Sequence, residues 1–180
     1  HFLDFVAWLM HEEPPLHAWG YGGRSQRVEA KYGDIFDHHS VVYEYANGPR
    51  VYALTRQQSL CFNGVYRTVF GTKGQLRVGP NKRQSGIFTN KGEAKWQSSE
   101  DQIIPEIIRY REMFTAMRAG NPINNCLSMA RSTMLAILGR MATHSGQRIT
   151  WDEAFASNKV LAPEPVDAAT DDPGAGRGGK

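Results

Sequence analysis

Residues 40–57 read SVVYEYANGPRVYALTRQ, two runs rich in Val and Tyr that are joined by Asn47-Gly48. Asn-Gly tolerates the positive φ that a tight hairpin turn requires. The stretch therefore predicts a strand, a turn and a second, antiparallel strand. Two further hairpins are predicted downstream by paired runs on either side of GTKG (65–70 and 75–78) and NKG (86–89 and 94–97). Together the three hairpins indicate one meandering, mainly antiparallel sheet.

The segments before this region change from a helical to an extended pattern. Residues 1–10 place apolar side chains at helical spacing, and Pro14-Pro15 forbids the helix to continue. Residues 16–30 carry Gly and aromatic residues, a composition typical of a strand with a bulge or bend.

The C-terminal third of the chain has helical periodicity. One helical face is formed by Ile107, Tyr110, Phe114 and Met117. A second helix is predicted over about 125–144, and the capping-box pattern of Thr150 to Glu153 opens a short third helix. Strands followed by helices predict an α+β fold, a mainly antiparallel open-faced sheet with helices packed on one face. The other face, which carries aromatic strand residues, is expected to be covered by a partner.

Composition places the chain among ordinary globular domains. It has 180 residues, 41% apolar and 22% charged, with a net charge of +3. The basic residues are scattered among acidic ones, so nucleic-acid binding is not expected, and no apolar run reaches the length of a membrane span. Residues 1–161 are predicted to form one domain. Residues 162–180 are rich in Pro, Gly, Ala and charge, which predicts a flexible tail.

Familiar chemical motifs are missing from the sequence. It contains no P-loop, GxSxG or HExxH, and residues 20–23, Gly-Tyr-Gly-Gly, are too short for a GxGxxG dinucleotide loop. Asp37-His38-His39 invites a metal site, but neighbours on a strand point to opposite faces and no third ligand is evident. No metal site is therefore predicted. Cys61 and Cys126 fit a reduced environment better than a disulfide scaffold.

Arg56 and the pair His1 and Asp4 can each be interpreted either as functional residues or as ordinary solvent-exposed charges. Arg56 ends the second strand of the first hairpin, where it is either a solvated charge or a fixed guanidinium that binds a polar ligand. His1 and Asp4 lie on one helical face, and spacing alone makes them an ordinary exposed pair.

A resemblance to a known family adds to this interpretation. It is carried by PEIIRYREMFTAMRAGNPINNCLSMARSTMLAILGRMATHSGQRITWDEA (105–154), by YGDIFDHHSVVYEYANGPRVYALTRQQ (32–58) and VFGTKGQLRV (69–78), and by the opening HFLDFVAWL (1–9). Over about residues 1–162 the chain resembles the C-terminal domain of Gfo/Idh/MocA oxidoreductases. That resemblance implies the substrate-binding and oligomerisation half of an enzyme whose Rossmann half, absent here, holds NAD or NADP.

The resemblance implies that this chain is part of an NAD(P)-dependent sugar or polyol dehydrogenase. The isolated chain is expected to be inactive, because hydride transfer needs the cofactor held against the substrate. Two alternatives stay open: an NAD-dependent enzyme that cleaves glycosides by oxidation and elimination, and a non-catalytic oligomerisation module. A homo-oligomer through the open sheet face is expected. The compartment would be cytoplasmic or, if the parent carries a signal peptide, periplasmic.

The resemblance also implies roles for three residues. His1 falls where the family often places a catalytic histidine, which implies an acid/base role toward a sugar hydroxyl. Arg56 matches an Arg-Gln near the substrate pocket of relatives. Tyr110 stands where many relatives have a histidine, so it either contacts a different substrate or fills the helix core beside Phe114. No residue of this chain is implied to bind the cofactor.

Overall fold

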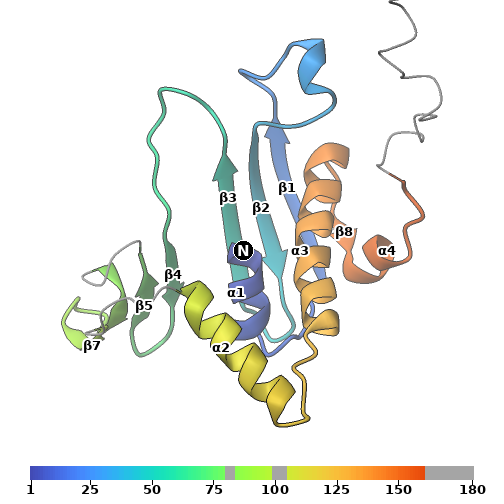
Figure 1. Ribbon diagram of the computed structural model, residues 1–180. Coiled ribbons are helices and arrows are strands. Elements are labelled where there is room, and N and C mark those ends of the chain that lie inside the picture. Colours follow the sequence, from blue (N-terminus) through green and yellow to red (C-terminus); the bar gives the residue numbers. More distant parts are fainter. Residues whose placement is uncertain (80–83, 99–104, 161–180) are drawn as a thin grey trace, which may run out of the picture.

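The computed structural model describes residues 1–79, 84–98 and 105–160. Within these ranges the chain is an α+β fold, as predicted, with two antiparallel four-stranded sheets and helices beside them (Figure 1). The predicted tail over residues 162–180 lies outside the described residues. No helix in the described ranges is long and apolar enough to cross a membrane.

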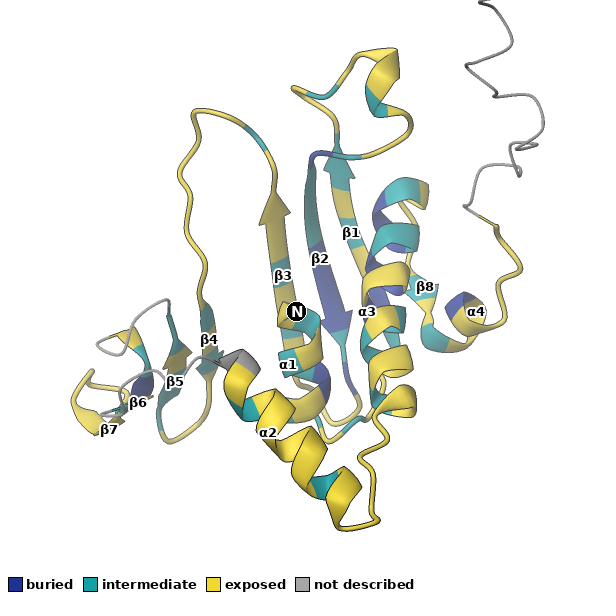
Figure 2. Ribbon diagram, viewed as in Figure 1, coloured by how far each residue is buried: buried dark blue, intermediate teal, exposed yellow. Residues whose placement is uncertain are grey.

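The first sheet, called sheet A, is built around the predicted hairpin. Its strands are β1 (His17–Gly23), β2 (His38–Glu44), β3 (Arg50–Arg56) and β8 (Ile149–Thr150), in the order β3-β2-β1-β8. The turn between β2 and β3 has positive φ angles at Asn47 (64°) and Gly48 (97°), which confirms the Asn-Gly prediction. Every pairing is antiparallel, and β2, in the middle, is the most buried strand of this sheet (Figure 2).

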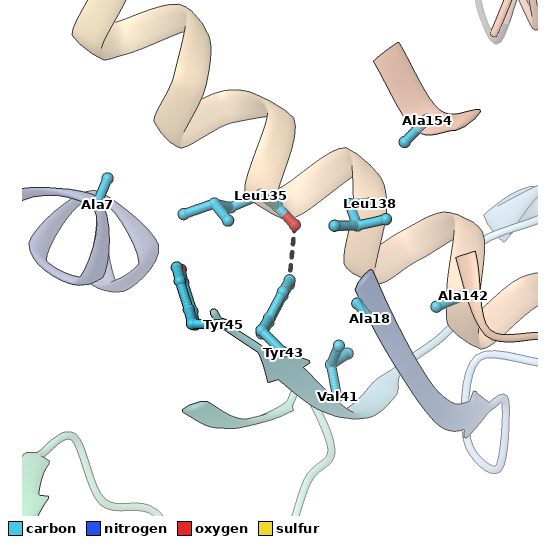
Figure 3. Close-up of a cluster of buried hydrophobic side chains, with 9 residues drawn as sticks. All are labelled: Ala7, Ala18, Val41, Tyr43, Tyr45, Leu135, Leu138, Ala142 and Ala154. Atoms are coloured by element: carbon cyan, nitrogen blue, oxygen red, sulfur yellow. Dashed lines mark hydrogen bonds between the residues drawn. The ribbon is translucent and has the colours of Figure 1, made fainter. Parts of the chain in front are cut away.

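One face of sheet A is covered by helices. Helix α3 (Cys126–Ser145) lies across β1 and β2, α1 (Phe2–Leu9) packs beside α3, and α4 (Trp151–Phe155) follows β8. The buried core lies between these layers and is shown in Figure 3. Thr150 and Glu153 form the predicted capping box at the start of α4.

A close approach of α3 to β2 fixes the centre of this core. The Tyr43 hydroxyl donates a hydrogen bond to the Leu135 carbonyl at 2.8 Å, across the helix–sheet interface (Figure 3). Gly139 makes this possible, because a Cβ at that position would collide with the Tyr43 hydroxyl. The glycine is therefore required by packing rather than by backbone conformation.

The second and third hairpins form a separate sheet, called sheet B. It contains β4 (Arg67–Phe70), β5 (Gln75–Val78), β6 (Gly86–Phe88) and β7 (Ala94–Gln97), in sequence order. The hairpins are confirmed, but the prediction of one continuous meander is wrong. Residues 57–66 between β3 and β4 form no strand, so β3 ends sheet A at a free edge. Each turn is encoded locally, whereas the pairing of successive hairpins is not.

Sheet B and helix α2 (Pro105–Arg118) contribute little buried surface. The apolar face of α2 formed by Ile107, Tyr110, Phe114 and Met117 is exposed in this chain (Figure 2). A contact between sheet B and the rest of the chain comes from Arg67. Its guanidinium carbon lies 4.3 Å from the ring centre of Phe2 and 5.4 Å from that of Phe5, both on α1.

Candidate functional site

The three residues implied by the resemblance lie in different parts of the structure. His1 directly precedes α1, is exposed and makes no side-chain capping bond. Arg56 ends β3 and donates a hydrogen bond from Nη2 to the Phe62 carbonyl at 2.7 Å. Tyr110 is half exposed on α2, with the Arg109 guanidinium carbon 5.3 Å from its ring centre.

The described chain does not bring these three side chains together. Within the described ranges no hydrogen bond, ion pair or ring contact joins any two of them. Val51 and Ala53 pack against the core, so strand alternation places Arg56 on the opposite, open face of sheet A, whereas His1 leads into a helix of the covered face. Their joint role stays a prediction. The exposure of Tyr110 and Phe114 does not support a helix-core role for Tyr110 within this chain.

The best organised polar cluster lies at one end of sheet A and is centred on Asp37. This residue is only 3% exposed. Its Oδ2 accepts hydrogen bonds from three consecutive backbone N–H groups, those of Ser25 (2.9 Å), Gln26 (2.8 Å) and Arg27 (3.0 Å). Its Oδ1 accepts from His38 Nδ1 and Gln58 Nε2, both at 2.8 Å. One carboxylate thus binds the β1–β2 loop to the segment after β3.

These contacts determine the ionisation of Asp37. Burial alone would raise its pKa, but the N–H groups of Arg27 and Gln26, with the side chains of His38 and Gln58, outweigh burial and hold the pKa of Asp37 well below its usual range. A carboxylate only accepts hydrogen bonds, so His38 must donate through Nδ1. In the neutral imidazole the lone pair then lies on Nε2, and the His38 side chain is 36% exposed.

This arrangement corrects the interpretation of Asp37-His38-His39. Neighbours on a strand point to opposite faces, yet Asp37 contacts its neighbour His38. The reason is that β2 begins at His38, so the alternation rule does not apply to Asp37. His39 instead faces the helices, where Nδ1 lies 2.9 Å from Thr143 Oγ1 on α3. The residues that the structure describes contain no group of three His, Cys, Asp or Glu arranged to hold a metal ion.

His39 belongs to an aromatic stack at the C-terminal end of α3. The Phe36 ring lies 3.8 Å from that of His144 in a stacked geometry and 5.6 Å from that of His39. Burial lowers the pKa of both histidines, and the positive charge of Arg140 lowers each further. Both are therefore favoured in their neutral form, as befits structural residues.

A cavity of about 510 Å³ opens between the two segments that Asp37 holds together. Its lining is polar and comes from the β1–β2 loop and the start of the β3–β4 segment: Gln26, Arg27, Tyr32, Gln57, Gln58 and Ser59. Sequence reasoning stopped at Arg56 and missed this cavity. The RQQS run of residues 56–59 was a usable signal, but the residues of the opposite wall lie 25 to 33 positions earlier in the chain and reach it only through folding.

A second polar network occupies the opposite end of the strands, on the open face of sheet A. Glu44 lies 2.5 Å from His17 Nε2 and accepts from Arg50 Nε at 2.8 Å, so the network joins three adjacent strands. The hydrogen bond from His17 is the main reason that the pKa of Glu44 is lowered, and Arg50 adds to it. Between the two polar ends lies an apolar strip with exposed Trp19, Tyr21, Tyr52 and Leu54.

Comparison with solved structures identifies what this fold resembles. Similar chains are myo-inositol 2-dehydrogenase from Lactobacillus plantarum (TM-score 0.62, 15% identity, covering 83% of this chain and 46% of that one) and aldose-aldose oxidoreductase from Caulobacter crescentus, complexed with glycerol (0.61, 12%, 82% and 44%). A third is the WlbA dehydrogenase from Bordetella pertussis, in complex with NADH and UDP-GlcNAcA (0.57, 18%, 83% and 42%).

These neighbours are oxidoreductases of the Gfo/Idh/MocA type, and the agreement confirms the fold that the resemblance implied. At 12–18% identity the agreement concerns the fold alone. This chain spans less than half the length of the three structures. It matches no protein-family model and no curated protein sequence.

Proposed function

We propose that this chain is the substrate-binding and oligomerisation part of an NAD(P)-dependent sugar or polyol dehydrogenase. The observation that carries the proposal is the shared fold. It covers most of this chain and 42–46% of three oxidoreductases, one solved with NADH and two named for aldoses and for myo-inositol. The substrate class, the cofactor and the assembly are part of the same proposal.

The residues of this chain do not fit a dinucleotide. The sequence has no GxGxxG, and the strand pairings among the described residues are all antiparallel, whereas a dinucleotide crevice is built from parallel βαβ units. The nicotinamide cofactor, which would accept the hydride, must therefore be held by another part of the enzyme. The isolated chain is then inactive, because no part of it that the structure describes holds hydride donor and acceptor together.

His1 is the candidate for proton transfer. Its side chain is exposed and makes no hydrogen bond within the described chain, so a ring nitrogen is free to accept the proton of a substrate hydroxyl. Arg56 and Tyr110 are candidates for substrate contact in the assembled enzyme. Arg56 is held in place by the Phe62 carbonyl, which limits its freedom.

Two measurements on the natural enzyme that contains these residues test this proposal. Titration with NADH and NADPH by fluorescence should show binding, and the 180-residue chain alone should show none. His1→Asn should lower kcat by about 10²- to 10⁴-fold with NADH binding unchanged. His11→Asn is the matched control on a nearby exposed histidine, and it should keep full activity. An enzyme that binds neither cofactor would overturn the proposal.

The open face of sheet A is the proposed oligomer interface. Tyr21, Tyr52 and Leu54 are 70%, 66% and 77% exposed on it, and they form one apolar strip between two polar ends. A strip of this kind is typical of a surface that a second copy covers. Light scattering should show an oligomer that Leu54→Lys dissociates, whereas Leu60→Lys, at a fully exposed leucine outside the sheet, should leave it intact. A monomeric parent protein would refute this part.

A further inference from the structure

We propose that the cavity beside Asp37 binds a sugar-like molecule that carries an anionic group. The cavity lies between the β1–β2 loop and residues 57–59, and the inference rests on its walls, its charge and its unused polar groups. It concerns binding only and does not depend on the dehydrogenase function proposed above.

The walls of the cavity are fixed by hydrogen bonds between the two segments. Gln26 donates from Nε2 to the Ser59 carbonyl at 3.1 Å, and its Oε1 accepts from the Ser59 N–H at 2.7 Å. Gln58 donates to Asp37 Oδ1 and to Ser25 Oγ. The side chains of Gln26 and Gln58 are therefore occupied in hydrogen bonds that join the two segments. A site whose walls are already held loses less entropy on binding than a mobile one.

Arg27 supplies a positive charge that the protein leaves unpaired. Its backbone N–H is used by Asp37, but within the described ranges its guanidinium has no hydrogen bond, ion pair or ring contact. By contrast, Arg24 donates to the Gly33 carbonyl and Arg56 to the Phe62 carbonyl. Arg27 is also half-buried, so it is partly withdrawn from water. A guanidinium in such a place favours a carboxylate or a phosphate, which it can bind through two parallel N–H groups.

No acidic side chain among the described residues pairs with the Arg27 guanidinium. Asp37 directs its oxygens at three backbone N–H groups, His38 and Gln58, and Glu29 pairs with Lys31 at 2.9 Å. Lys31 lies 5.1 Å from the ring centre of Tyr32, on the cavity wall, but its charge is offset by Glu29. The unpaired charge of Arg27 therefore favours an anionic ligand.

The remaining lining groups suit the hydroxyl groups of a sugar. Tyr32 and Gln57 line the cavity, and neither the Tyr32 hydroxyl nor the Gln57 side-chain amide has a hydrogen-bond partner among the described residues. A phenol and a primary amide both donate and accept, as vicinal hydroxyl groups do. A volume of about 510 Å³ lies within the range of small-molecule sites. A sugar acid or a sugar phosphate meets both requirements.

The test is an NMR titration of the full 180-residue chain, without cofactor. The probes are D-glucuronate, D-glucose 6-phosphate and the uncharged D-glucose. We expect at least one anionic probe to shift the amide signals of residues 25–32 and 57–59, and to bind at least tenfold more tightly than glucose. Which of the two anions binds more tightly identifies the anionic group. Equal shifts with glucose, or shifts elsewhere only, would overturn the proposal.

Variants assign the recognition to individual residues. Arg27→Gln should weaken binding of the anionic probe by about tenfold or more, and Arg148→Gln, an exposed arginine before β8, should not change it. Tyr32→Phe should weaken binding of both the charged and the neutral probe by a similar factor, which a merely electrostatic site would not show. Unchanged affinity in Arg27→Gln, with the fold verified by its amide spectrum, would overturn the assignment. A longer enzyme that fails to bind NAD(P)H would disprove the dehydrogenase function and leave this result standing.

Discussion

The two sheets of this protein have the same number of strands and the same antiparallel pairing, yet only sheet A has a substantial core. Sheet A lies under α3 and α1, and its central strand β2 has three consecutive buried residues, Val41, Val42 and Tyr43. Sheet B buries Gly86 and Phe88, and β7 is exposed along its whole length. Strand pairing makes a sheet, but a layer packed on its face makes a core.

This contrast predicts where the free energy of unfolding resides. Burial of apolar area is the dominant favourable contribution to folding, and α3 with sheet A supplies most of it within the described chain. Sheet B and α2 should contribute little to the free energy of unfolding, because they bury little apolar surface. Substitutions in the core of sheet A should therefore cost more unfolding free energy than substitutions in sheet B.

Leu138→Ala should destabilise the protein most. Leu138 is completely buried between α3 and sheet A, and the substitution removes apolar contacts and leaves a cavity, at a cost of about 3 kcal/mol in unfolding free energy. Urea denaturation followed by circular dichroism measures it. Leu127→Ala, in the same helix but 64% exposed, should change stability by less than about 0.5 kcal/mol. Equal effects at the two positions would contradict the proposed core.

Gly139→Ala should cost about 2 kcal/mol, although alanine is the better helix former. The added Cβ collides with the Tyr43 hydroxyl and breaks its hydrogen bond to Leu135. Tyr43→Phe alone should cost about 1 kcal/mol. Because removal of the hydroxyl relieves part of the collision, the double variant should lose less than the sum of the two, and thermal unfolding of all four proteins measures the difference. Strict additivity would mean that α3 shifts instead.

Acid should weaken the sheet A region before the sheet B region. Burial lowers the pKa of His39 and His144 in the folded state, so the unfolded chain takes up protons first as the pH falls. Stability is therefore full above the unfolded pKa of about 6.5 and declines as the pH drops below it. Sheet B contains no histidine. Denaturation between pH 8 and pH 5 should show the loss, and His144→Phe should reduce it; an unchanged slope in that variant would refute the assignment.

Arg67→Leu should have the smallest global effect, about 0.5 kcal/mol. It removes the contact of the Arg67 guanidinium with Phe2 and Phe5, through which β4 meets α1. Hydrogen exchange should quicken in β4 and β5 and stay unchanged in β2. Arg77→Leu is the matched control, because Arg77 contacts Phe88 within sheet B. Faster exchange throughout both sheets would show that the two regions unfold together.

Local sequence signals predicted the elements well. The Asn47-Gly48 turn, the two later hairpins, the capping box at Thr150 and the long helix near residues 125–144 are all present. Each depends on a few neighbouring residues with a strong conformational preference. The division into two sheets was not predictable in this way, because no sequence pattern near residues 57–66 indicates whether β3 and β4 pair.

The polar clusters were predictable only in part. Asp37-His38 stood out in the sequence, but the three N–H groups that bind Asp37 come from a loop 10 to 12 residues earlier. Gln58 and the cavity it helps to line depend on the same loop closure. The apolar face of α2 was recognised, yet the sequence does not state that this chain leaves it exposed. His1, Arg56 and Tyr110 remain expectations from family resemblance.

The Asp37 cluster has a consequence for the accessibility of the β1–β2 loop. Arg24, Arg27 and Lys31 place three cleavage sites for trypsin in the exposed stretch that this carboxylate ties to the sheet. A protease needs several residues in extended form, and a loop bound at three consecutive N–H groups cannot readily offer them. We therefore expect the Asp37 side chain to slow tryptic digestion of this segment.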